Sequence, residues 1–131
     1  MYYLPAFKMV RGRMAIVTVN GNAKINLSYD DFVEVVKLLL RGAMFDEKWY
    51  ISTYPDVAEA VARGVYKSGR QHFIEIGYFE GRCPQDFEVD EKWYLRTYPD
   101  VADGIKNGDI QSARQHFNQH GYIEGRVPAD S

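Results

Sequence analysis

The chain has 131 residues, enough for one ordinary domain or two small ones, and 46% of its residues are hydrophobic, as in globular proteins. A net charge of −2 disfavours electrostatic binding of nucleic acid, and a single cysteine excludes both an intrachain disulfide and a multi-cysteine metal site. The sequence holds no run of 18 apolar residues and no secretory signal pattern at its start. We therefore expect a cytoplasmic protein that binds no nucleic acid and does not insert into a membrane.

The first 44 residues predict a β-hairpin followed by one helix. The candidate strands 14–19 and 22–27 flank Asn20-Gly21, a dipeptide that accepts the positive φ angles of a type I′ turn. Residues 7–10 are a candidate third strand of the same sheet. This segment forms the first predicted domain, over residues 1–44.

A helix is expected directly after the hairpin. Ser28 is a typical N-cap residue, and the apolar stripe of residues 29–41 would cover one face of the sheet. The other sheet face and the chain start would stay uncovered, which is typical of an oligomer interface. The predicted interface residues are Tyr3, Leu4, Val17 and Val19.

The rest of the chain is a tandem repeat. Residues 46–84 and 90–128 align without a gap at an offset of 44, and 23 of the 39 aligned positions are identical. Each copy should therefore fold into the same small unit, and we predict domains over residues 45–88 and 89–131. Because one copy alone has few apolar residues, we expect the two to stack on a shared core.

Each repeat predicts three short helices. Asp, Ser and Gln at cap positions and Gly at stop positions supply the local signals. In the first copy the expected N-caps are Asp46, Asp56 and Ser68, and the expected ends are Tyr54, Gly64 and Gly77. The predicted fold class is therefore α+β and mostly α, with an N-terminal hairpin before two stacked repeats of three short helices.

The repeat also resembles a known family. The pattern D-x-x-W-Y-L-x-x-Y-P-D-V-A, followed by H-F-x-x-x-G-Y-x-E-G-R-x-P, is similar to a short bacterial tandem repeat appended to glycosyltransferases and other surface-polysaccharide proteins. The resemblance covers residues 45–128. It implies a surface-polysaccharide or envelope pathway and transfers no catalytic residue.

The histidines are the first candidate site. His72 and His116 occupy the same repeat position, and each is either a general base paired with a nearby aspartate or a half-buried side chain bonded to a tyrosine or the backbone. We favour the structural alternative because no nucleophile pattern accompanies them. His116 and His120 have the spacing of two metal ligands on one helix face, but two ligands are too few, and we predict no metal site.

The second set of candidates is aromatic and cationic. Trp49 and Trp93 are either sugar-stacking platforms or core residues. Arg82 and Arg126 either bind a sugar or phosphate or pair with an aspartate of the repeat, which for Arg82 is Asp56 or Asp46. The structural alternative is favoured for all four residues, which remain the predicted binding residues if a ligand is bound.

These features favour a non-catalytic protein-interaction module with a scaffold or regulatory role. We expect self-association through the N-terminal β segment, a further protein partner, no cofactor and no catalytic residue. One alternative is a carbohydrate-binding module that uses Trp, Tyr and Arg of the repeats. Another is a small enzyme with a repeat histidine as its base.

Overall fold

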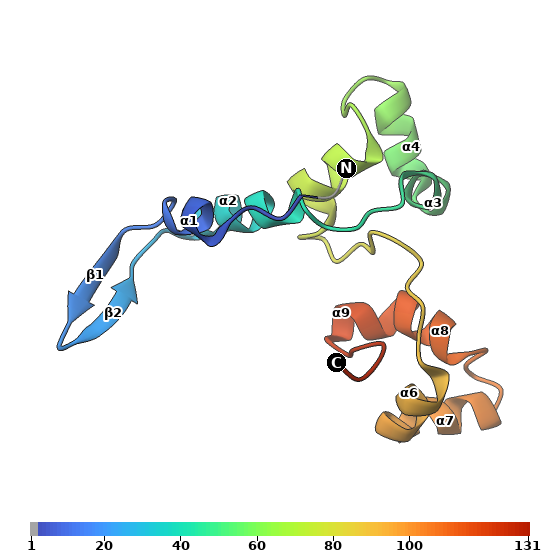
Figure 1. Cartoon of the computed structure of the whole chain (residues 1–131). Helices are drawn as coiled ribbons and strands as arrows, with labels where there is room; N and C mark the ends of the chain where they lie inside the picture. Colours follow the sequence, from blue (N-terminus) through green and yellow to red (C-terminus); the bar gives the residue numbers. More distant parts are fainter. Residues whose placement is uncertain (1–2) are drawn as a thin grey trace. The chain divides into compact units, whose positions relative to one another are not determined.

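The computed structural model describes residues 3–131, which divide into two compact units at the boundary between Phe45 and Asp46. The fold is α+β and mostly α, as the sequence predicts, with one two-stranded hairpin near the N-terminus (Figure 1). Within residues 3–131, no helix has the length and apolar character needed to cross a bilayer.

The hairpin has the register that its turn dictates. Strands β1 (Ile16–Val19) and β2 (Asn22–Ile25) are antiparallel, with Val19 opposite Asn22. Asn20 and Gly21 have φ angles of 52° and 78°, as a two-residue turn with the local twist of a hairpin requires. The predicted hairpin is thus confirmed.

The predicted third strand is wrong, because residues 7–10 are helical. Helix α1 (Phe7–Arg11) begins after Ala6, whose carbonyl accepts hydrogen bonds from the amides of Met9 and Val10. These local bonds satisfy the backbone groups that a third strand would have paired with the sheet. Helix α1 packs along α2 (Tyr29–Leu40) instead.

Helix α2 forms where predicted but does not cover the hairpin. The Ser28 hydroxyl accepts a hydrogen bond from the Asp31 amide at 3.1 Å, which confirms the predicted cap. Helix α2 buries Val35 and Leu38, and the element that it contacts is α1. The four-residue strands project beyond α2 and stay largely exposed, so the expected packing of helix on hairpin is wrong (Figure 1).

The two repeats fold alike, as their sequence identity requires. In both copies the third α-helix continues as a π-helical segment, marked η. The first repeat comprises α3 (Glu47–Thr53), α4 (Pro55–Ala62), α5 (Gly69–His72) and η1 (Phe73–Gly77). The second comprises α6 (Glu91–Thr97), α7 (Pro99–Lys106), α8 (Ala113–His116), η2 (Phe117–Gly121) and α9 (Tyr122–Glu124).

Most of the predicted helix boundaries are confirmed. The Asp46 carboxylate accepts a hydrogen bond from the Trp49 amide at 3.0 Å, and the Ser68 hydroxyl accepts one from the Gln71 amide at 3.0 Å. Gly64 has a φ of 77°, the left-handed conformation expected at a helix end.

Two boundaries differ from the prediction. Helix α4 begins at Pro55 rather than being capped by Asp56, because proline has the φ of a first helical turn and needs no amide partner there. The third helix ends at Gly77 in the first repeat, as predicted, but continues past Gly121 as α9 in the second repeat, and the left-handed glycines are Gly81 and Gly125. Gly77 is required for space, since a β-carbon there would collide with the Tyr50 hydroxyl.

Each repeat closes on itself. The amides of the cap residues Asp46 and Asp90 donate to the carbonyls of Pro84 and Pro128, both at 3.0 Å. The buried cluster of the second repeat consists of four of its own residues, Tyr94, Val101, Ala113 and Phe117. Phe87 and Val89 of the preceding linker pack against this cluster. The expected single core shared by both repeats is thereby corrected, and tyrosines rather than tryptophans are the largest fully buried side chains.

Candidate functional site

The predicted arginines are held inside their own repeats. The two terminal nitrogens of Arg82 donate to the two carboxylate oxygens of Asp56 at 2.9 and 2.6 Å, and the guanidinium lies 4.9 Å from the centre of the Tyr54 ring. Arg126 repeats the arrangement at 2.9 and 2.7 Å to Asp100. We call each such group of arginine, aspartate and tyrosine a clamp. It joins the start of the second helix to the return loop.

The tryptophan of each repeat lies against the same tyrosine as the arginine. Trp49 contacts the Tyr54 ring edge to face, with centroids 6.2 Å apart, and the Tyr54 hydroxyl accepts a hydrogen bond from the Cys83 amide at 3.0 Å. Trp93 has the equivalent contact at 6.1 Å. Both indoles are half-buried. The structure therefore brings each predicted tryptophan and arginine together around a tyrosine of their own repeat.

The clamp shifts the ionisation of its carboxylates. The hydrogen bonds from Arg82 lower the pKa of Asp56 to about 2, and those from Arg126 lower the pKa of Asp100. Both carboxylates are therefore charged over the physiological pH range. A bidentate pair engages two donors of the guanidinium and both carboxylate oxygens, which fixes their relative orientation. The clamp therefore holds the return loop against the start of the second helix.

The histidines pair with buried tyrosines. His72 is 6% exposed, and its Nδ1 lies 2.9 Å from the Tyr50 hydroxyl, while His116 and Tyr94 form the same bond at 2.9 Å. This is the structural alternative of the sequence analysis. Burial lowers the pKa of both imidazoles, with a smaller contribution from the nearby arginine, so the neutral form is favoured. Burial also raises the pKa of Tyr94 to about 12.

His116 and His120 do not gain further metal-ligating neighbours. Their ring centroids are 5.8 Å apart and tilted, and His120 is at the surface. Over residues 3–131 no cluster of three or more His, Cys, Asp or Glu side chains is placed to hold a metal ion.

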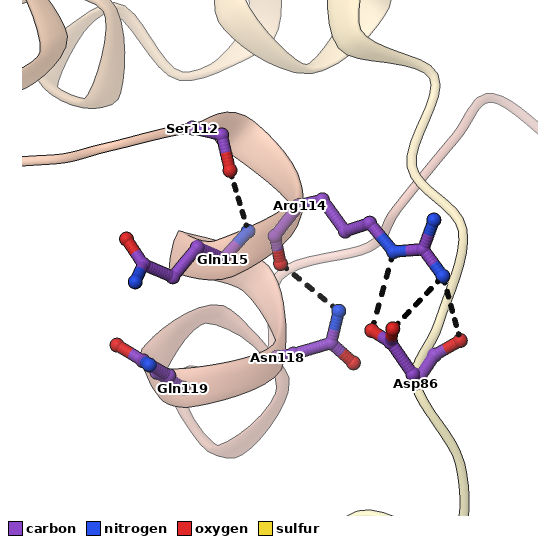
Figure 2. Close-up of a pocket in the computed structure, with 6 residues that line it drawn as sticks. All are labelled: Asp86, Ser112, Arg114, Gln115, Asn118 and Gln119. Atoms are coloured by element: carbon purple, nitrogen blue, oxygen red, sulfur yellow. Dashed lines mark hydrogen bonds and ion pairs between the residues drawn. The ribbon is translucent and has the colours of Figure 1, made fainter.

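A polar cavity of about 290 Å³ lies on the second repeat (Figure 2). The Arg114 guanidinium donates to both carboxylate oxygens of Asp86 at 3.2 and 3.0 Å, which fixes one wall. The Asn118 amide group donates to the Arg114 and Phe87 carbonyls and accepts from the Phe87 amide. The cavity is lined by Asp86, Ser112, Arg114, Gln115, Asn118 and Gln119.

The polar cavity is specific to the second repeat. At an offset of 44, the positions of Asn118 and Gln119 hold Ile74 and Glu75 in the first repeat. The fold of a repeat therefore does not require these amides. The sequence analysis did not identify this site, although a comparison of the two copies at their non-identical positions could have indicated it.

An apolar groove of about 420 Å³ lies where the two repeats meet. It is lined by the return loop of the first repeat and by α9 of the second: Tyr78, Phe79, Gly81, Tyr122 and Ile123. Burial raises the pKa of Tyr122 to about 12, with Tyr78 among its neighbours. The groove is part of the contact between the repeats.

The predicted interface residues of the N-terminal unit are exposed by 42–76% but do not form one surface. Val17 and Val19 lie on the hairpin, which precedes the start of α2. The backbone of Tyr3 lies against Gly42, just beyond the end of α2, and Leu4 follows it. Since α2 has 12 residues and spans about 18 Å, the two pairs are at opposite ends of that helix.

Comparison with protein-family models, with curated proteins and with solved structures found no match to this chain.

The clamp predicts a measurable coupling between Arg82 and Asp56. In a double-mutant cycle of Arg82→Gln and Asp56→Asn, we expect a coupling free energy of about 1 kcal/mol or more, because a bidentate, partly buried pair is stronger than an exposed one. Urea unfolding followed by tryptophan fluorescence reports on the repeats, since both tryptophans lie in them. The matched control is Arg63 with Glu59, an exposed pair 3.9 Å apart, for which about 0.3–0.5 kcal/mol is expected. Equal couplings for the two pairs would contradict the role of the clamp.

The buried imidazoles predict a loss of stability in mild acid. The pKa of His72 and His116 is lowered in the folded state, so below about pH 6.5 the unfolded chain binds more protons and the free energy of unfolding falls with pH. The decline should be seen between pH 7.5 and 5, where Asp56 stays charged. His72→Gln should make it shallower in urea unfolding. His120→Asn, which removes a surface imidazole, should leave most of the decline in the free energy of unfolding. An equal effect of both variants would contradict the assignment of the decline to the buried imidazoles.

Proposed function

We propose that this chain is a non-catalytic protein-interaction module with a scaffold or regulatory role in a bacterial surface-polysaccharide or envelope pathway. The pathway is suggested by the resemblance of the repeat sequence. The proposal places the module in the cytoplasm, where the single free thiol of Cys83 stays reduced.

One observation carries the proposal, namely that the chemically active side chains common to both repeats are used within their own repeat. Arg82 binds Asp56, His72 binds Tyr50, and the equivalent bonds recur in the second copy. A catalytic base would need access to a substrate, and His72 is 94% buried beneath the repeat surface. The geometry thus favours a rigid platform over an active site.

Exposed apolar side chains support an interaction role. Val17 and Val19 lie on one hairpin face and remain largely exposed, as do Phe7, Tyr29 and Phe32 of the helical part of the same unit. A short hairpin with an exposed apolar face is typical of a surface that is covered in an assembly. We propose that the hairpin face of Val17 and Val19 mediates self-association.

The hairpin face can be tested by charge. Val17→Lys together with Val19→Lys should lower the mass measured by light scattering to 15.1 kDa, because two ammonium groups cannot be buried against an apolar partner. Both side chains are exposed, so the fold should be kept, as circular dichroism would check. Thr18→Lys on the opposite strand face is the matched control and should keep the mass of the parent. A parent chain that is already monomeric would remove this part of the proposal.

Carbohydrate binding at the polar cavity is the second candidate function. The carboxamide groups of Gln115 and Gln119 line the cavity, and Figure 2 shows both pointing away from the fixed pair of Arg114 and Asp86. Carboxamide groups suit the hydroxyls of a sugar because each of them both donates and accepts hydrogen bonds. The site differs from the predicted one, since Arg82 and Arg126 are engaged in the clamps.

A glycan array with neutral and acidic sugars tests this candidate. Gln119→Glu introduces the residue that the first repeat has at the equivalent position, Glu75, so the fold should tolerate it. If a sugar binds at the cavity, this variant should reduce binding by about tenfold or more, while Glu75→Gln should leave it unchanged. The absence of any bound glycan would exclude the second candidate.

A further inference from the structure

The start of the N-terminal unit combines exposed apolar side chains with exposed cations. Leu4 and Phe7 are 76% and 75% exposed, so both side chains are largely uncovered. Lys8 and Arg11 of helix α1 and Arg13 just beyond it are exposed as well. We call these five residues the basic–apolar patch.

The helical members of the patch share one side of α1. Successive residues of an α-helix are about 100° apart around its axis, so Phe7, Lys8 and Arg11 fall within about 100° of one another. Val10 is the one residue of α1 that is not exposed, and α1 packs along α2 (Figure 1). An apolar ring and two cations therefore lie together on a side of the helix that solvent reaches.

The positive charge of the patch is not neutralised by ion pairs. Residues 1–29 contain four Lys or Arg residues and no Asp or Glu. Among residues 3–131, no carboxylate forms an ion pair with Lys8, Arg11 or Arg13. The patch therefore has an excess of positive charge that suits an anionic partner.

The acidic residues of the N-terminal unit have structural roles on α2. Asp30 and Asp31 lie in its first turn, where the helix dipole stabilises negative charge. The Glu34 carboxylate pairs with the Lys37 ammonium group at 3.5 Å. These carboxylates stabilise α2 and leave the cations of the patch available to a partner.

A lipid surface with anionic headgroups matches this combination of side chains. Its phosphate and carboxylate groups attract Lys and Arg, and the boundary of the acyl chains takes up apolar side chains such as Phe and Leu. Lipids are fluid and surround single protruding side chains, whereas a protein partner needs an extended complementary surface. A helix of five residues with a Phe7 side chain that is three-quarters exposed offers a protrusion of this kind.

We propose that the basic–apolar patch docks this chain on the surface of an anionic lipid membrane. Its two apolar side chains enter the headgroup region, and its three cations bind the headgroup anions. The docking is peripheral and reversible, because the apolar contribution of two side chains is small without the electrostatic one. The proposal goes beyond the proposed function and does not use the hairpin face of Val17 and Val19.

Vesicle flotation with the full chain tests the proposal. The chain should bind vesicles of phosphatidylcholine and phosphatidylserine at about a 2:1 ratio, and should bind vesicles of phosphatidylcholine alone about tenfold more weakly or less. Phe7→Ser should weaken binding to the anionic vesicles by about tenfold, because it removes apolar surface from the patch. Lys8→Gln with Arg11→Gln should weaken it by about tenfold or more, because two charges are lost.

The matched controls lie in the repeats. Val65→Ser removes another exposed apolar side chain, and Lys92→Gln with Lys106→Gln removes two exposed cations, so both variants should bind like the parent chain. Circular dichroism should show that all variants are folded.

Light scattering separates this proposal from self-association, because Phe7→Ser should keep the mass of the parent chain. Equal binding to both kinds of vesicle, or binding to neither, would overturn the docking proposal. Unchanged vesicle binding by Phe7→Ser would also overturn it, since the patch would then be a site for any polyanion.

Discussion

A guanidinium group held by a carboxylate and set against a tyrosine ring is the interaction on which both repeats depend. In the first copy it connects Asp56, at the start of the second helix, to Arg82 in the return loop. The loop is thereby directed back so that Pro84 accepts a hydrogen bond from the Asp46 amide. Three helices of 7–9 residues, each too short to be stable alone, become one closed unit through this connection.

The identical positions of the repeats form the internal contacts of each copy, and the non-identical positions lie where the surroundings of the copies differ. Identical residues form the clamp, the tyrosine–histidine bond and the glycine that leaves space for the tyrosine hydroxyl. Non-identical residues lie where the copies differ in their surroundings. Asn118 binds the linker at Phe87, whereas its equivalent is Ile74, and Cys83 is covered, whereas Val127 is open. Specific binding by this protein is therefore to be sought at the non-identical positions.

Closure of each repeat also limits how the repeats can interact. Because the buried cluster of the second repeat is formed by its own residues and its linker, the two copies meet through small surfaces at Gly81, Cys83 and α9.

The sequence by itself determined the elements whose causes lie within a few residues. The turn at Asn20-Gly21, the cap at Ser68 and the helix end at Gly64 follow from local backbone geometry and local hydrogen bonds, and all three could be predicted. Only the tertiary structure decided between Asp56 and Asp46 as the partner of Arg82, and only it showed the exposure of the hairpin and the polar cavity beside Asn118. These features depend on contacts between residues 26 or more positions apart, or on the lack of such contacts. Their outcome is set by how whole elements pack, which no local pattern encodes.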